Sequence, residues 1–109
     1  IDSVTALSGS GPAYVFAFIE ALEAGGVNLG LTAETARQLA IQTVMGAAQM
    51  ALQSPLPPST LRQNVTSPGG TTAAALQILQ TGGFNALIAQ ALQGAAHRSA
   101  ELADTYGAQ

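Results

Sequence analysis

One short stretch combines hydroxyl side chains with residues that shape the backbone, and it reads VTSPGGTTAAAL over residues 65–76. Pro68 fixes one φ angle, and the two glycines after it permit conformations closed to other residues. Thr71 or Thr72 then stands at the start of an alanine-rich run that predicts a helix. Because the first amides of a helix lack internal partners and carry the positive end of its dipole, this stretch predicts a site for a carboxylate or phosphate. A turn followed by a helix cap is the alternative interpretation.

A second glycine-bearing stretch, SGSGPAY at 8–14, invites comparison with the dinucleotide-binding pattern G-x-G-x-x-G. No strand is predicted before it, Tyr14 occupies the third glycine position, and no acidic residue lies about 20 residues on at the end of a second strand. We therefore interpret it as a helix start with Pro12 in the first turn. A helix start that also lines a ligand site is the alternative.

His97 shares one predicted helical face with Glu101 and Asp104, and Ser67 could complete a nucleophilic triad. A triad also needs a strained nucleophile and an oxyanion hole, so a solvated histidine paired with Glu101 is favoured. One histidine and scattered carboxylates predict no metal site. The sequence contains no lysine, which excludes a Walker-type phosphate loop and lysine-based catalysis.

The composition predicts one folded domain, covering residues 1–109. Its 109 residues are 48% hydrophobic and 8% charged, which is too apolar for a disordered chain. The net charge of −3 argues against a nucleic-acid partner, and the apolar runs are too short for a membrane span. The absence of cysteine suits a reducing compartment, and we expect a soluble, cytoplasmic protein that does not bind membranes.

Glycine and proline divide the sequence into helical segments, and no alternating run of β-branched residues predicts a strand. The fold class is therefore predicted to be all-α. The expected helices run from Ser10 or Gly11 to about Leu29, from a Thr32 cap to about Gln53, from Thr60 to Asn64, from Thr72 to Gln80, and from Phe84 to about Asp104.

The second expected helix carries a narrow polar stripe on an otherwise apolar surface. At 100° per residue its glutamines fall within an arc of about 60°; they are Gln38, Gln42, Gln49 and Gln53. A chain of this length cannot easily cover so broad an apolar surface, which predicts a core shared between two copies. A compact monomeric bundle is the alternative.

Two long stretches resemble a known family. LRQNVTSPGGTTAAALQIL, residues 61–79, resembles the signature of pyrroline-5-carboxylate reductase, and VTALSGSGPAYVFAFIEALEAGGVNLGL, residues 4–31, resembles the start of that family's C-terminal domain. The blocks AIQTVMGAAQM and GGFNALIAQAL also fit, so the resemblance covers essentially the whole chain.

The resemblance implies a helical bundle that forms an interlocked homodimer, or a higher assembly of dimers. It also implies an enzyme that uses NADP or NAD to reduce 1-pyrroline-5-carboxylate to L-proline. The family holds the dinucleotide mainly in an N-terminal Rossmann domain, so this C-terminal chain alone is expected to be inactive. A non-catalytic helical dimer that binds small carboxylates is the alternative function.

The resemblance also implies roles for individual residues. Thr72 is expected to lie near the ring nitrogen of the substrate and to be the catalytic residue. The residues implied to bind the substrate, with its carboxylate on backbone amides, are Ser67, Pro68, Gly69, Gly70, Thr71 and Thr72, and those implied to lie close to the nicotinamide are Val65, Ser10, Gly11 and Pro12.

Overall fold

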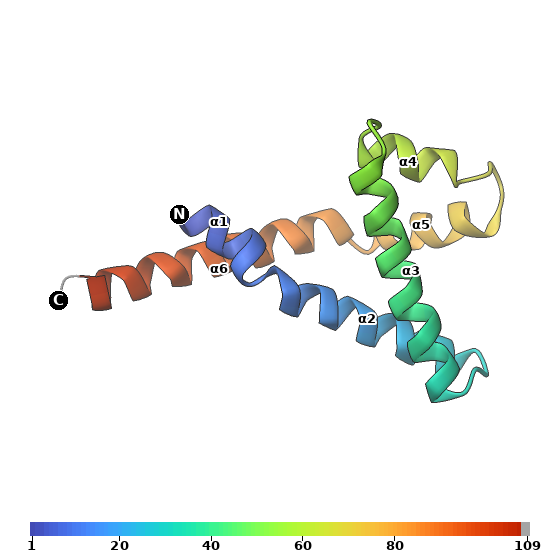
Figure 1. The fold of residues 1–109 in the computed structure, drawn as a ribbon, viewed down its shortest axis with the longest axis horizontal. Coiled ribbons are helices and arrows are strands. Elements are labelled where there is room, and N and C mark those ends of the chain that lie inside the picture. The colour runs from blue at the N-terminus through green and yellow to red at the C-terminus, as the bar shows by residue number, and fades with distance from the viewer. Residues whose placement is uncertain (108–109) are drawn as a thin grey trace. The chain divides into compact units, whose positions relative to one another are not determined.

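The computed structural model describes residues 1–107, and over this range it contains helices and connecting turns but no strand, which confirms the all-α fold class (Figure 1). The last two residues of the predicted domain, 108–109, lie outside the described residues. In chain order the elements are α1 (Asp2–Val4), the π-helix η1 (Thr5–Gly9), α2 (Gly11–Asn28), α3 (Ala33–Gln53), α4 (Pro58–Asn64), α5 (Thr71–Thr81) and α6 (Phe84–Gly107).

These elements fall into two compact units, each described by itself below. Among the described residues, the terminal unit combines residues 1–14 with residues 75–107. The central unit comprises residues 15–74 and contains most of α2, all of α3 and α4, and the loop that leads into α5.

In the terminal unit, α1 and η1 pack against α6, as Figure 1 shows. Ala6 of η1 is 2% exposed, so its small side chain is covered at this packing contact. The Ser99 hydroxyl of α6 donates a 2.8 Å hydrogen bond to Oδ1 of Asp2, which ties the start of the chain to the last helix. The sequence analysis missed α1 and η1, because their eight residues show no helical periodicity of their own and are stabilised by packing on α6.

In the central unit, the joint between α2 and α3 depends on two glycines. Gly30 has a φ of +104°, a conformation that favours glycine at the end of a helix. A Cβ atom on Gly26 would lie 3.2 Å from the Cβ of Ala36, so the missing side chain allows the close approach of α2 and α3. The predicted Thr32 cap is confirmed, since the Thr35 amide donates to its Oγ1 at 3.2 Å.

Most predicted helix boundaries agree with the structure within a few residues. Among the helix starts, the predicted and observed positions differ most for α4, which begins at Pro58 and not at Thr60. Pro58 lacks an amide hydrogen, which the first turn of a helix does not use, and Pro57 adopts the extended conformation that precedes it. The sequence analysis treated proline here only as a residue that divides helical segments.

Few side chains are buried in this chain. Among the described residues only Ala6, Ala36 and Ala40 are buried, and many large apolar side chains are exposed. On α3, Leu39 is 53% and Met50 is 55% exposed. This exposure agrees with the expectation that a second copy of the chain covers these side chains and completes the core. None of the helices in residues 1–107 is long and apolar enough to span a bilayer.

Candidate functional site

The loop between α4 and α5 contains a tight turn from Ser67 to Gly70. The Gly70 amide donates to the Ser67 carbonyl at 3.0 Å, and Gly69 has a φ of +71°. Proline at the second position and a positive-φ glycine at the third are the pattern of a type II turn. Gly69 is therefore required by its backbone conformation. Gly70 is constrained differently, because a Cβ atom there would lie 3.2 Å from the Ser67 carbonyl oxygen.

The turn leads directly into α5, and Gly70 is the residue that caps it. The Ala74 amide donates to the Gly70 carbonyl at 3.1 Å, which is the first hydrogen bond of the helix. Among the described residues no protein acceptor is found for four amides ahead of it, those of Gly69, Thr71, Thr72 and Ala73. We call these four N–H groups the loop amides.

One expectation about this helix start is wrong. The sequence suggested Thr71 or Thr72 as the residue that caps the helix, but both residues lie inside its first turn. In the part of the chain that the structure describes, neither hydroxyl makes a side-chain hydrogen bond to the backbone. The reason is that the closed turn already places the Gly70 carbonyl at the capping position, one residue earlier than the sequence pattern suggested. Both threonines are exposed.

The electrostatics of the loop favour an anion. The loop amides lie at the positive end of α5, and the first turn of this helix contains no acidic residue. The loop is exposed from Ser67 to Gly69, so a small ligand can reach the amides from solvent. A short carboxylate or phosphate is the group that such an arrangement can hold.

The residues just before the turn fasten the loop to α4. The Thr66 hydroxyl donates to the Arg62 carbonyl at 2.6 Å, which terminates α4 with a side-chain hydrogen bond. The sequence analysis did not assign Thr66 a role. The sequence signal for such a bond is a serine or threonine just after a helix, four residues beyond a residue of its last turn, because its hydroxyl can then donate to that residue's carbonyl.

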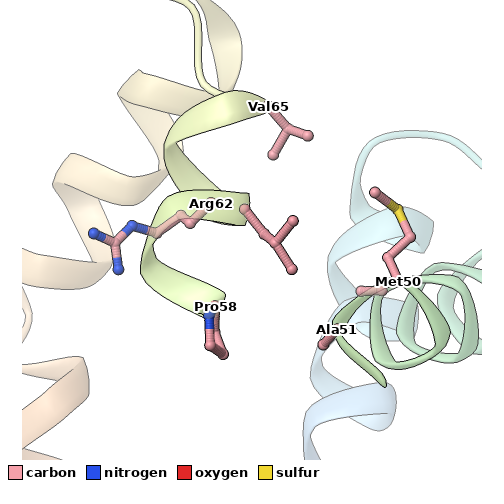
Figure 2. Close-up of a pocket in the computed structure, with 7 residues that line it drawn as sticks. Met50, Ala51, Pro58, Arg62 and Val65 are labelled. Carbon is pink, nitrogen blue, oxygen red and sulfur yellow. The ribbon is translucent and has the colours of Figure 1, made fainter. Parts of the chain in front are cut away.

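Val65 contributes to a different feature, an apolar cavity of about 290 Å³ between α3 and α4. Figure 2 shows Met50 and Ala51 of α3 on one side and Pro58 and Val65 on the other, with the Arg62 guanidinium directed away from the space between them. Val65 is 62% exposed. Its predicted place beside a nicotinamide stays a prediction.

The other three residues predicted to lie near a nicotinamide belong to the terminal unit. Ser10 follows η1 and accepts a hydrogen bond from the Ala13 amide at 3.1 Å, and Gly11 and Pro12 begin α2. A Cβ atom on Gly11 would have no neighbour within 4 Å, so this helix start is open on that side. The structure thus confirms a glycine-bearing helix start, and its ligand role stays a prediction.

The histidine pairs as expected. His97 Nδ1 lies 3.6 Å from Oε1 of Glu101, and Arg98 reaches the same oxygen at 3.5 Å. Both basic side chains are largely exposed, which is the solvated i,i+4 arrangement that the sequence favoured over a triad. The described residues contain no group of three or more His, Cys, Asp or Glu side chains that could hold a metal ion.

Comparison with known protein families gives one match that covers almost the whole chain. Residues 1–102 match the family described as pyrroline-5-carboxylate reductase dimerisation. Among curated proteins, the chain is 56% identical over 107 residues to a pyrroline-5-carboxylate reductase of Pseudomonas aeruginosa, and this match covers 98% of the chain and 39% of the relative. It is 52% identical over 104 residues to a reductase of the same name from Arabidopsis thaliana, covering 95% of the chain and 38% of that relative.

Solved structures give the same result. A pyrroline-5-carboxylate reductase of Coxiella burnetii matches with a TM-score of 0.90 and 50% identity over 93% of this chain and 37% of that one. A pyrroline carboxylate reductase of Plasmodium falciparum, solved with NADP bound, matches with a TM-score of 0.87 and 41% identity over 90% of this chain and 37% of that one. The chain thus spans about two fifths of the length of each relative.

Proposed function

The chain belongs to the pyrroline-5-carboxylate reductase dimerisation family, and from this membership we propose that it forms the helical C-terminal domain of a reductase. The proposed reaction converts 1-pyrroline-5-carboxylate to L-proline at the expense of NADH or NADPH. In this reaction residues 1–109 supply the loop that binds the substrate carboxylate and the interface between two subunits. The observation that carries the proposal is the set of four loop amides at the start of α5.

The loop amides fit the carboxylate of a small amino-acid-like substrate. Two carboxylate oxygens can accept hydrogen bonds from two to four N–H groups, and charge-assisted bonds of this kind are shorter and stronger than neutral ones. Gly69 adds no side chain on this exposed turn, and nothing lies within 4 Å of the position a Cβ would take. The backbone of Ser67 to Thr72 would therefore set the position of the substrate, and the side chains would matter less.

Thr72 is the proposed exception, since its hydroxyl is exposed in the first turn of α5. Reduction of a C=N bond needs a hydride on carbon and a proton on nitrogen. A hydroxyl that faces the ring nitrogen can accept a hydrogen bond from the protonated imine and so orient the carbon that is reduced. Positioning supplies much of the rate in such a site, because a protonated imine is already electrophilic.

A nicotinamide cofactor would supply the hydride when bound. Gly11 has no side chain, and nothing lies within 4 Å of the position that a Cβ atom would take. This open space would allow the planar nicotinamide ring to lie against the backbone of Gly11. We propose that Ser10, Gly11 and Pro12, together with Val65, lie close to the nicotinamide. The dinucleotide itself would be held mainly by a Rossmann domain outside this chain.

The exposed apolar side chains support a homodimer in which the two copies interlock their helices, alone or within a larger assembly of dimers. A helical chain that leaves residues such as Leu39 and Met50 half exposed gains stability when a second copy covers them. A reducing, cytoplasmic setting remains a prediction that rests on the lack of cysteine.

A chimeric enzyme tests the proposed function. In this chimera the chain replaces the matching 107 residues of the Pseudomonas aeruginosa relative, and the unmodified relative is the control. We expect the chimera to oxidise NAD(P)H in the presence of 1-pyrroline-5-carboxylate with a kcat/KM within about ten-fold of the control. A folded, dimeric chimera without this activity would contradict the proposal, and binding of L-proline by that protein would then favour the non-catalytic carboxylate-binding dimer.

A further inference from the structure

The residues before α2 depart from regular helical hydrogen bonding. In an α-helix the Ser10 amide would donate to the Ala6 carbonyl, four residues earlier. It donates instead to the Thr5 carbonyl at 2.9 Å, five residues earlier, which is the π-type bond that defines η1. Short π-helical turns often occur at functional sites, because they redirect the residues that follow them.

This irregular turn diverts the Ser10 amide from the Ala6 carbonyl, and a tyrosine hydroxyl satisfies that carbonyl. Tyr14, in the first turn of α2, donates from its hydroxyl to the Ala6 carbonyl oxygen at 2.8 Å. Ala6 is 2% exposed, so water cannot easily take the place of this donor. The Tyr14 side chain is half-buried, as expected for a tyrosine with an apolar ring and a satisfied hydroxyl.

The Tyr14 hydrogen bond spans the residues between η1 and α2. It joins the buried end of η1 to the first turn of α2, and the backbone between them is Leu7 to Ala13. The only other side-chain bond from this stretch runs from the Ser8 hydroxyl to the Val4 carbonyl at 2.9 Å, within the described residues. That bond lies on an exposed surface and does not reach α2.

We infer that Tyr14 is a positioning residue for the nicotinamide of the cofactor. Its hydroxyl fixes the backbone of Ser10, Gly11 and Pro12, so that the open side of Gly11 is held ready for the ring. This inference rests on the proposed function, because it takes from there the place of these three residues beside the cofactor. Tyr14 itself does not need to touch the cofactor or the substrate.

The test compares two substitutions that each remove one hydroxyl from this stretch of the chimeric enzyme. Tyr14→Phe keeps the ring and removes the bond to Ala6, and Ser8→Ala is the matched control because it removes the bond to Val4. We expect Tyr14→Phe to raise the KM for NAD(P)H about five-fold, with the KM for 1-pyrroline-5-carboxylate within two-fold of the parent, and Ser8→Ala to change neither value by more than two-fold. A purely structural role would lower the melting temperature of Tyr14→Phe without this selective change in cofactor KM.

A measurement on the chain itself adds a readout that does not depend on activity. Hydrogen exchange of the Ser10 and Ala13 amides should be about five-fold faster in Tyr14→Phe than in the parent or in Ser8→Ala, because both amides belong to the segment that Tyr14 holds and both are hydrogen-bonded. Unchanged exchange, or a cofactor KM within two-fold of the parent, would overturn the inference.

A third variant separates this inference from the proposed function. Gly11→Val places a branched side chain into the open space at the start of α2, where it would meet a bound nicotinamide. If Gly11→Val raises the cofactor KM and Tyr14→Phe does not, only the role of Tyr14 is wrong. If neither variant affects the cofactor KM, the proposed place of residues 10–12 beside the nicotinamide is wrong as well.

Discussion

The Gly70 amide donates to the Ser67 carbonyl at 3.0 Å, and this bond divides the amides of the loop into two kinds. The Gly70 amide is used inside the turn. The four loop amides, those of Gly69, Thr71, Thr72 and Ala73, have no acceptor among the described residues and remain available to a ligand. The proposed carboxylate would therefore bind on the outer side of the turn and at the helix start, and Gly70 would act as a structural residue of this candidate site.

Gly69→Ala should destabilise the protein, because the new side chain would have to adopt a φ of +71°. A non-glycine residue in this region costs about 1 kcal/mol in free energy of unfolding. The melting temperature of the chain measures the effect. Gly25→Ala is the matched control, since Gly25 lies within α2 at an ordinary φ and its Cβ would have no neighbour within 4 Å. A Gly69→Ala variant as stable as Gly25→Ala would contradict the assigned turn.

Gly70→Val should impair substrate binding more than folding. Its Cβ would lie 3.2 Å from the Ser67 carbonyl oxygen and 3.4 Å from the Ser67 Cβ, so the turn must open and the loop amides move. The exposed loop contributes little to the packing that stabilises the helices. In the chimeric enzyme we expect a raised KM for 1-pyrroline-5-carboxylate and a nearly unchanged melting temperature. Unaltered kinetics would remove the loop from the site.

Thr72→Ala should lower kcat/KM in the chimeric enzyme by about ten-fold or more. A factor of ten corresponds to about 1.4 kcal/mol, which one hydrogen bond to a charged group can supply. Thr72→Ser keeps the hydroxyl and should recover most of the activity. Thr81→Ala, at the other end of α5, is the control for a threonine lost from the same helix.

Thr71→Ala is the variant whose result could contradict the proposed role of Thr72. Because Gly70 caps α5, Thr71→Ala removes no capping bond and should leave the melting temperature nearly unchanged. A larger loss of kcat/KM in Thr71→Ala than in Thr72→Ala would transfer the proposed role to Thr71.

Met50→Glu should weaken the dimer. Met50 is 55% exposed and lines the apolar cavity between α3 and α4, so a charge there would be buried when a second copy covers this surface. Gln49→Glu introduces the same charge on the neighbouring polar stripe and should leave the dimer intact. Sedimentation at micromolar concentration checks both variants and the parent, whose monomer mass is 10.9 kDa. A parent chain that sediments as a monomer would contradict the shared core.

The sequence predicts the five longer helices well, because each has its own local signals. Thr32 and the glycines at 30 and 83 mark helix ends by well-understood chemistry. The turn at Ser67 to Gly70 was predictable only as a flexible loop. The hydrogen bond between Gly70 and Ser67 decides which residue caps α5. Helix propensities cannot predict the position of a helix cap to within one residue.

Other features depend on contacts between distant residues, and the sequence could not reveal them. α1 and η1 form where residues 2–9 pack on α6, and the bond between Asp2 and Ser99 joins residues 97 positions apart. The proposed role of Tyr14 rests on an irregular turn at Ser10, which no local sequence pattern predicts. The proposed roles of the loop residues in catalysis came from the family resemblance, since hydroxyl groups and free amides alone fit several small anions.

A structure of the chimeric enzyme with L-proline bound tests the central claim most directly. We predict that the carboxylate of proline lies within about 3 Å of at least two loop amides, with the Thr72 hydroxyl directed toward the ring nitrogen. A proline carboxylate held elsewhere, for example by the Arg62 guanidinium, with the loop amides bound only to water, would contradict the account.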